Sequence, residues 1–444
     1  MAPDTTQEFN SRSAPGWWRL DNAAKIYPAI RTSRWSSVYR VSLELKEDID
    51  PEILYKALRQ TLQRMPTVAV RMRAGLFWYY FEPNKKPPLL HQDVQYPCAH
   101  IDAAKNNGYL FKVRYYRSRI ALEVFHSLAD GTGGMVFLKT LTAQYLRLRY
   151  NIEIPCTDGI LDISESAGAE ETEDAYKRYV NLGKTRSRVE SRAYQIKGVK
   201  EPEGVLHVIT GKLPAEALIR QAKQYGATVT EYLTAVYMYA VYQQQCELPR
   251  KRYAPVKISV PVKMRRFFPS QTGRNFSLFV NPEIDPNAGS YTFEEIVRQV
   301  HNFLQLEVNA KALNAQMAAN VRSEKNLFVR VLPLCVKRAA LSAYYHFAGE
   351  TRFSGTLSNM GVIRLPEAMA PYVERASFIL GRSKVNSNAC AVATLGNSVY
   401  ITFSRSIEEA QIERSFFTFL IRSGVPVRIR SNGQEQADEF ENKD

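Results

Sequence analysis

The alternation of hydrophobic and polar residues predicts strands and helices mixed along the chain, beginning with a strand at 36–46. Asp50 then offers a helix cap, and Pro51 fits the first helical turn, where a missing N–H costs nothing. The predicted helix carries one apolar face, made of Ile53, Leu54, Ala57, Leu58 and Leu62. Short β-rich runs follow at 67–72 and 76–82.

A hairpin and then a long helix are predicted next. The runs 109–117 and 119–126 flank a tight turn near Ser118, which is typical of two antiparallel strands. Either Asp130 or Thr132 can cap the helix that follows, because both side chains accept hydrogen bonds from helical N–H groups.

The opening pattern then recurs in the second half of the chain. A strand-like run at 205–213 leads into Pro214 and an amphipathic helix that Gly226 ends, in the same strand–proline–helix order as 38–64. We therefore expect two related halves. Further strands are predicted at 256–262, 276–280, 351–357, 375–380, 389–394 and 398–404, with helices at 232–242, 292–345 and 408–422.

The composition changes between the two halves. Residues 157–203 are first acidic and then rich in Lys and Arg, without a clear hydrophobic period, and so we interpret them as a surface connection. The fold class expected is α/β, with two similar mixed-sheet domains. The predicted division is a first half at 1–160, a linker at 161–203, a second half at 204–430 and an acidic, disordered tail at 431–444.

Hydropathy and cysteine content narrow the class of protein. No apolar run approaches the ~20 residues that a membrane-spanning helix needs, and the N-terminus has no apolar signal core. We therefore expect a cytoplasmic protein, with peripheral membrane contact left open. The five cysteines are scattered without metal spacing, which indicates buried free thiols in a reducing compartment and no metal site.

The net charge of +15 is concentrated in part between Arg250 and Arg274, a stretch without acidic residues. No nucleic-acid-binding motif accompanies it, so a nucleic-acid partner is not expected. Two interpretations stay open: a face that attracts a phosphorylated cofactor and a solvated face without a partner. The basic residues are Arg250, Lys251, Arg252, Lys257, Lys263, Arg265, Arg266 and Arg274.

The strongest candidate for chemistry is the stretch His-Ser-Leu-Ala-Asp-Gly at 126–131. The imidazole of His126 has an ordinary pKa of ~6.5, which suits a general base at neutral pH. Asp130 lies too far along the chain to orient the ring and is expected to pair with an arginine, while Gly131 lets other groups approach closely. The alternative is a strand-to-helix turn in which Asp130 only caps a helix. No phosphate-binding loop, serine-hydrolase elbow or zinc-protease motif is present.

This stretch resembles the His-x-x-x-Asp-Gly signature of the chloramphenicol acetyltransferase-like superfamily of acyltransferases. The resemblance extends over nearly the whole chain through four further segments. These are Leu-Asp-Asn-Ala-Ala-Lys-Ile-Tyr-Pro at 20–28, Thr-Val-Thr-Glu-Tyr-Leu at 228–233, Val260-Pro261-Val262 with Arg265, and Ser358-Asn359-Met360-Gly361. Bacterial alcohol acetyltransferases and condensation domains are the members most similar to this chain.

The resemblance implies two domains that meet at a tunnel with His126 at its centre. It implies that His126 is the general base, that Asp130 is structural, and that Ser358 or Asn359 stabilises the oxyanion of a tetrahedral intermediate. The charge of Lys263, Arg265 and Arg266 suggests a site for the phosphates of coenzyme A. Acyl-CoA would be a donor co-substrate, with no permanently bound cofactor.

Departures from the family pattern favour one branch. Condensation domains usually have a second histidine where this chain has Phe125, and the plant-type Asp-Phe-Gly-Trp-Gly motif is absent. Arg274-Asn275 stands where relatives often have Gly-Asn, which leaves the role of Asn275 open. We expect a monomeric, acyl-CoA-dependent O-acyltransferase acting on a small alcohol or amine. The alternatives are a catalytically silent scaffold and an N-acyltransferase or condensation-type enzyme that uses a carrier-protein thioester.

Overall fold

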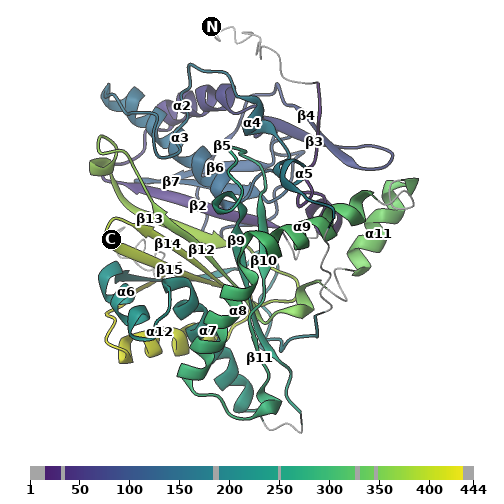
Figure 1. Ribbon diagram of the computed structural model, residues 1–444. Coiled ribbons are helices and arrows are strands. Elements are labelled where there is room, and N and C mark those ends of the chain that lie inside the picture. Colours follow the sequence, from purple (N-terminus) through teal and green to yellow (C-terminus); the bar gives the residue numbers. More distant parts are fainter. Residues whose placement is uncertain are drawn as a thin grey trace, which may run out of the picture.

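The computed structural model describes residues 16–31, 36–183, 190–248, 252–325, 331–344 and 349–433. It has the expected mixed α/β architecture, with a five-stranded and an eight-stranded sheet as its two main layers (Figure 1). The five-stranded sheet has the order β13-β2-β7-β6-β5. Its strands are β2 (Val38–Leu45), β5 (Leu90–Gln92), β6 (Phe111–Tyr116), β7 (Arg119–Phe125) and β13 (Val373–Leu380).

Two long helices, α2 (Pro51–Arg64) and α3 (Gly131–Tyr150), pack against each other, and α3 lies against β2 and β7. Asp50 caps α2 as predicted, with its Oδ1 atom accepting from the N–H groups of Glu52 and Ile53 at 2.9 and 3.1 Å. Asp130, not Thr132, caps α3. A small sheet of β1 (Trp18–Arg19), β4 (Tyr79–Pro83) and β3 (Val70–Ala74) completes this half.

The eight-stranded sheet repeats the strand–helix order of the first half. Its strands are β8 (His207–Pro214), β9 (Val256–Lys263), β10 (Ser277–Val280), β11 (Glu283–Ile284), β12 (Gly355–Ile363), β14 (Asn388–Leu395), β15 (Ser398–Arg405) and β16 (Arg428–Ser431). The helices α6 (Ala215–Gln224), α7 (Val229–Cys246), α8 (Phe293–Glu307) and α12 (Gln411–Arg422) gather beside it (Figure 1). Thr228 and Glu231 form a capping box at the start of α7.

The chain crosses between the two main sheets near its C-terminal end. β12 pairs with β9 and β14 in the eight-stranded sheet. The next strand, β13, pairs with β2 in the five-stranded sheet, and the chain then returns to the eight-stranded sheet as β14. Side chains from β12 and β13, including Met360 and Phe378, therefore belong to the hydrophobic core of the N-terminal half. This double crossing ties the halves together on either side of a cavity.

Residues 161–203 do not run only over the surface, so that part of the prediction is wrong. They form two short helices, α4 (Ala169–Thr172) and α5 (Ala175–Tyr179), and Tyr176, Tyr194 and Ile196 are buried in the core of the second half. The Tyr176 hydroxyl donates to the Ser277 carbonyl oxygen at 2.6 Å. These buried residues do not recur at a regular interval along the chain, so the hydrophobic pattern did not reveal them.

The cysteines and the remaining predicted segments agree with the structure only in part. All five cysteines are free, but Cys156, Cys246 and Cys335 are exposed, so burial was predicted correctly only for Cys98 and Cys390. Two further helices, α9 (Ala310–Lys325) and α11 (Leu334–Tyr344), lie in the predicted helical stretch. Within the described ranges, no helix has both the length and the apolarity needed to cross a membrane. Of the predicted tail, residues 434–444 lie outside the described residues.

Candidate active site

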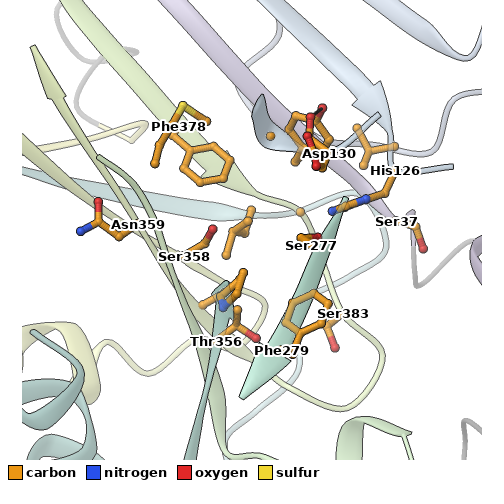
Figure 2. Close-up of a pocket in the computed structure, with 18 of the residues that line it drawn as sticks. Ser37, His126, Asp130, Ser277, Phe279, Thr356, Ser358, Asn359, Phe378 and Ser383 are labelled. Carbon is orange, nitrogen blue, oxygen red and sulfur yellow. Dashed lines mark hydrogen bonds between the residues drawn. The ribbon is translucent and has the colours of Figure 1, made fainter. Parts of the chain in front are cut away.

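A cavity of about 240 Å³ lies where the two sheets meet, and it brings together most of the predicted site (Figure 2). Residues of β9, β10, β12, β13 and the turn after β7 line it. Of the predicted site residues, the lining includes His126, Asp130, Gly131, Lys263, Arg265, Ser358 and Asn359. Arg266 does not line it; that side chain is exposed and lies over the ring of Phe267.

His126 directly follows β7, and its ring is held on two sides. The backbone N–H of His126 donates to the Ser37 carbonyl oxygen at 2.8 Å. The imidazole stacks on Tyr27 with ring centroids 4.6 Å apart, and Tyr39 meets it edge-on at 5.3 Å. These contacts fix the orientation of the ring, which points into the cavity (Figure 2).

Asn275 sets the protonation of the imidazole. Its Nδ2 atom donates to Asp21 Oδ2 at 3.3 Å and to the Ser127 carbonyl oxygen at 3.5 Å, so its Oδ1 atom faces His126 Nδ1 at 3.1 Å. An amide oxygen only accepts, and therefore Nδ1 carries the proton. The basic Nε2 atom has no hydrogen-bond partner among the described residues and is left for the cavity. The role of Asn275, open in the sequence, is to fix this tautomer.

Burial shifts the pKa values of His126 and Asp21, the two titratable groups that Asn275 connects. Burial lowers the pKa of His126 below its ordinary value, although the hydrogen bond from Nδ1 and the charge of Asp130 act in the opposite direction. The imidazole is therefore neutral at pH 7. Burial also raises the pKa of Asp21 to about 6, against the opposing charge of Arg274. Asp21 is thus mainly ionised at pH 7 and can accept from Asn275.

Asp130 forms the arginine pair that the sequence predicted. Its Oδ2 atom accepts from Arg265 Nη1 at 2.7 Å and from the Phe276 N–H at 2.9 Å, while Oδ1 accepts from the Gly133 N–H at 3.0 Å. Burial alone would raise the pKa of Asp130, but Arg265 and these hydrogen bonds outweigh it and hold the pKa below its ordinary value. Asp130 therefore joins the start of α3 to the loop before β10.

Arg265 is committed to this structure and not to a cofactor. Besides Asp130, its guanidinium donates to the carbonyl oxygens of Thr272 and Arg274 at 2.8 and 2.7 Å through Nη2. Nε also donates to Thr272, at 3.3 Å. With donors of Nε, Nη1 and Nη2 all used inside the protein, the geometry argues against the predicted contact of Arg265 with coenzyme A.

The basic segment 250–274 does not form a single basic face. Lys257 is buried, and its ammonium contacts Glu283 and donates to Ser191 Oγ at 3.0 Å. Arg274 is also buried and donates to the Arg19 carbonyl oxygen at 2.5 Å. Lys263 lines the cavity and contacts the Met360 carbonyl oxygen, and burial lowers its pKa. Arg250 and Lys251 lie outside the described residues.

The glycines at the start of α3 serve close packing. A Cβ atom on Gly133 would clash with the Gly273 carbonyl oxygen, and one on Gly134 would clash with the Tyr39 hydroxyl. At Gly131 a Cβ atom would come within 3.4 Å of Met360 Cε, at the edge of the cavity. The need for glycine is therefore greatest at 133 and 134, which the sequence analysis did not single out.

Ser358 and Asn359 both reach the cavity from β12, but they differ in their partners. Asn359 Nδ2 donates to Thr230 Oγ1 at 3.0 Å, and its Oδ1 atom accepts from the Gly361 N–H at 2.8 Å. Asn359 thus shapes the irregular end of β12, where Gly361 has a φ of 75°. The Ser358 hydroxyl has no hydrogen bond to a described residue and faces the same space as His126 (Figure 2).

Residues 206–379 match the protein family described as alcohol acetyltransferase. A search of curated protein sequences finds no significant match. Among solved structures, trichothecene 15-O-acetyltransferase from Fusarium sporotrichioides is similar, with 12% identity, a TM-score of 0.61, and coverage of 93% of this chain and 97% of the other.

Two further solved structures share the fold. Polyketide synthase associated protein 5 from Mycobacterium tuberculosis has 14% identity and a TM-score of 0.60, covering 92% of this chain and 98% of its own. The first condensation domain of the calcium-dependent antibiotic synthetase has 16% identity and a TM-score of 0.57, covering 93% and 97%. Together with the family match and the geometry of His126, these likenesses agree with the resemblance read from the sequence. The chain therefore has the fold shared by these acetyltransferase and condensation-domain structures, and its segment 206–379 matches the alcohol acetyltransferase family.

Proposed function

We propose that this protein transfers an acyl group from an acyl-CoA thioester directly to the hydroxyl group of a small alcohol, with His126 as general base. The observation that carries the proposal is the contact between His126 Nδ1 and Asn275 Oδ1 at 3.1 Å. It directs a neutral, unpaired Nε2 atom toward a cavity between two sheets. A base in that state can accept a proton without first losing one.

The reaction needs no covalent enzyme intermediate. The alcohol gives its proton to Nε2 as its oxygen attacks the thioester carbonyl carbon, forming a tetrahedral intermediate. The C–S bond then breaks, and the imidazolium returns the proton to the departing thiolate. The products are an ester and a free thiol, and His126 is neutral again. The aromatic face of Tyr27, which stacks on the ring, favours the transient imidazolium.

Ser358 is the better candidate for stabilising the oxyanion. Its hydroxyl group is available to the cavity, whereas the amide of Asn359 is engaged by Thr230 and the Gly361 N–H. A donor that is already in place stabilises the developing charge without reorganisation during the reaction. Asn359 would then act by holding β12, and Ser358 by donating.

The comparisons support a thioester donor of this kind. A starter condensation domain with the same fold, from rhizomide synthetase, was solved in complex with C8-CoA; it has 15% identity and a TM-score of 0.57, covering 91% of this chain and 94% of the other. The match to the alcohol acetyltransferase family favours an alcohol acceptor over an amine. A cytoplasmic location and a monomeric state stay predictions from the sequence.

The test is to incubate the purified protein with acetyl-CoA and a panel of alcohols and amines, and to measure thiol release together with ester or amide formation. We expect ester formation that falls by about 10³-fold in His126→Ala, since general bases contribute roughly 10²–10⁴-fold. His301→Ala, at a partly exposed position on α8 that does not line the cavity, is the matched control and should keep wild-type rates. Equal rates in wild type and His126→Ala would contradict the base assignment. Failure with every acyl-CoA and every carrier-bound donor would favour the scaffold alternative.

A further inference from the structure

A second cavity of about 210 Å³ adjoins the reaction cavity, and the two share Arg382 and Ser383 as lining residues. Ser383 is labelled in Figure 2. The second cavity lies under the loop 381–386, which connects β13 of one sheet to β14 of the other. Its lining consists of polar and charged residues with few apolar ones: Lys200, Glu201, Pro202, Glu203, Arg382, Ser383, Lys384, Val385, Ser387 and Ser406.

Three cations, Lys200, Arg382 and Lys384, line this second cavity together with the carboxylates of Glu201 and Glu203. Lys200 and Lys384 are exposed, and neither forms an ion pair with a described residue. Arg382 donates from Nη1 to the Pro202 carbonyl oxygen at 2.7 Å and from Nη2 to the Glu201 carbonyl oxygen at 2.9 Å. Carbonyl oxygens hold the guanidinium in place but leave its positive charge uncancelled.

Three acidic groups lie near these cations, and they differ in their surroundings. Glu201 Oε1 pairs with His207 Nε2 at 2.5 Å, pointing its charge toward β8. Glu203 is exposed and belongs to the lining of the cavity. Glu350 lies buried beneath the loop; burial raises its pKa, against hydrogen bonds from the loop and the charge of Lys384. With three cations and two carboxylates among the lining residues, the formal charge of the lining is +1 (3 − 2).

The loop that carries these cations is fixed at both ends. At Gly381, a Cβ atom would clash with the Val38 carbonyl oxygen, so the loop begins tightly against β2. At its other end, Glu350 Oε2 accepts from the Val385 N–H at 2.9 Å, and Asn386 Nδ2 donates to the Glu350 carbonyl oxygen at 3.1 Å. The backbone that carries Arg382 and Lys384 is thus anchored at both ends of the loop.

We propose that this second cavity, lined by Lys200, Arg382 and Lys384, binds the phosphate groups of the thioester donor, so that the pantetheine arm reaches His126 past Arg382 and Ser383. The inference rests on the proposed function. The sequence predicted that Lys263, Arg265 and Arg266 bind these phosphates. In the structure, Arg265 is occupied by other partners, Arg266 lies off the cavity and Lys263 contacts the Met360 carbonyl oxygen. Coenzyme A and a carrier-bound phosphopantetheine share this phosphate chemistry.

The test measures the dissociation constants (Kd) of coenzyme A and of unphosphorylated pantetheine by calorimetry. Lys384→Glu should raise the Kd of coenzyme A by about tenfold, because it replaces an attractive charge with a repulsive one. The Kd of pantetheine should stay within about twofold, because pantetheine is uncharged and the charge at residue 384 neither attracts nor repels it. Lys200→Glu should act in the same direction. Lys223→Glu on α6 and Arg266→Glu are charge-matched controls that should change neither constant.

Two competitors identify the source of the phosphate. Displacement of coenzyme A by adenosine 3′,5′-bisphosphate, weakened in Lys384→Glu, supports the site and a coenzyme A donor. Displacement by 4′-phosphopantetheine alone, weakened in the same variant, supports the site and a carrier-bound donor.

The proposal fails if Lys384→Glu and Lys200→Glu both bind every phosphorylated probe as tightly as the wild type. It fails equally if pantetheine weakens as much as coenzyme A, or if Arg266→Glu alone has an effect. When thiol release persists in those cases, only this inference is lost. A wild-type protein that binds no probe and releases no thiol contradicts the proposed function as well.

Discussion

The reaction cavity and the second cavity beside it differ in how completely their charged groups are paired. Around His126, the carboxylate of Asp130, the guanidinium of Arg265 and the amide of Asn275 are all hydrogen-bonded to other parts of the protein. Under the loop 381–386, Lys200 and Lys384 form no ion pair with a described residue. The first region holds its own charges in place, and the second presents unpaired charges.

This difference explains why charge along the sequence was a poor guide to cofactor contacts. Arg265 belongs to a basic stretch, yet it is a structural partner of Asp130. Lys384 stands apart from that stretch, yet its charge is available. A cation marks a ligand site only where the fold leaves it without a carboxylate, because paired charges have already offset their desolvation.

The largest expected effect comes from breaking the paired region. Arg265→Ala should lower the free energy of unfolding by about 3 kcal/mol, since it leaves the buried Asp130 carboxylate without its cation. Urea denaturation followed by circular dichroism measures this. The neighbouring exposed cation provides the control, and Arg266→Ala should change the free energy by less than about 0.5 kcal/mol. Equal effects in the two variants would remove the distinction between paired and unpaired cations.

A smaller effect is expected from removing the Ser358 hydroxyl, which forms no hydrogen bond to a described residue. Ser358→Ala should lower kcat by about 100-fold with little change in KM, because the oxyanion forms only during the reaction. Ser358→Thr keeps a hydroxyl and should recover much of the loss. Steady-state kinetics of thiol release would separate the two constants. A loss confined to KM would assign Ser358 to binding of the ground state.

The smallest kinetic effect is expected at Asn275. Asn275→Ala should lower kcat by about tenfold, the equivalent of one lost hydrogen bond, because Nδ1 then has no fixed acceptor on this side. The exposed Asn287 is a matched control, and Asn287→Ala should leave kcat unchanged. If Asn275→Ala kept the wild-type kcat, the tautomer would be set without it.

Much of the fold was readable because it depends on local patterns. The cap at Asp50, the hairpin that ends before His126 and the start of α3 each follow from neighbouring residues. The pairing of β13 with β2 could not be predicted, because the alternation of hydrophobic and polar residues predicts a strand but not the strand with which it pairs. The crossing that closes the cavity therefore became visible only in the structure.

The site, like the fold, has a part that the sequence predicted and a part that only the structure showed. The motif at 126–131 is contiguous, so the sequence revealed it directly. Asn275 lies 149 residues from His126, and its role depends on a contact between the two sheets. Gly133 and Gly134 are needed because Gly273 and Tyr39 pack against them, which no local spacing announces. The motif pointed to His126, while the residues that hold its ring became visible only in the fold.

The central claim is that His126 is a neutral base with its proton on Nδ1 and Nε2 free. Nitrogen-15 NMR of the histidine rings, assigned by comparison with His126→Ala, measures both properties across a pH series. We predict a neutral Nδ1–H ring at pH 7 that gains its second proton only as the pH falls below the ordinary value of ~6.5, because burial lowers the pKa. An Nε2–H tautomer, or an imidazolium already present at pH 7, would contradict the account.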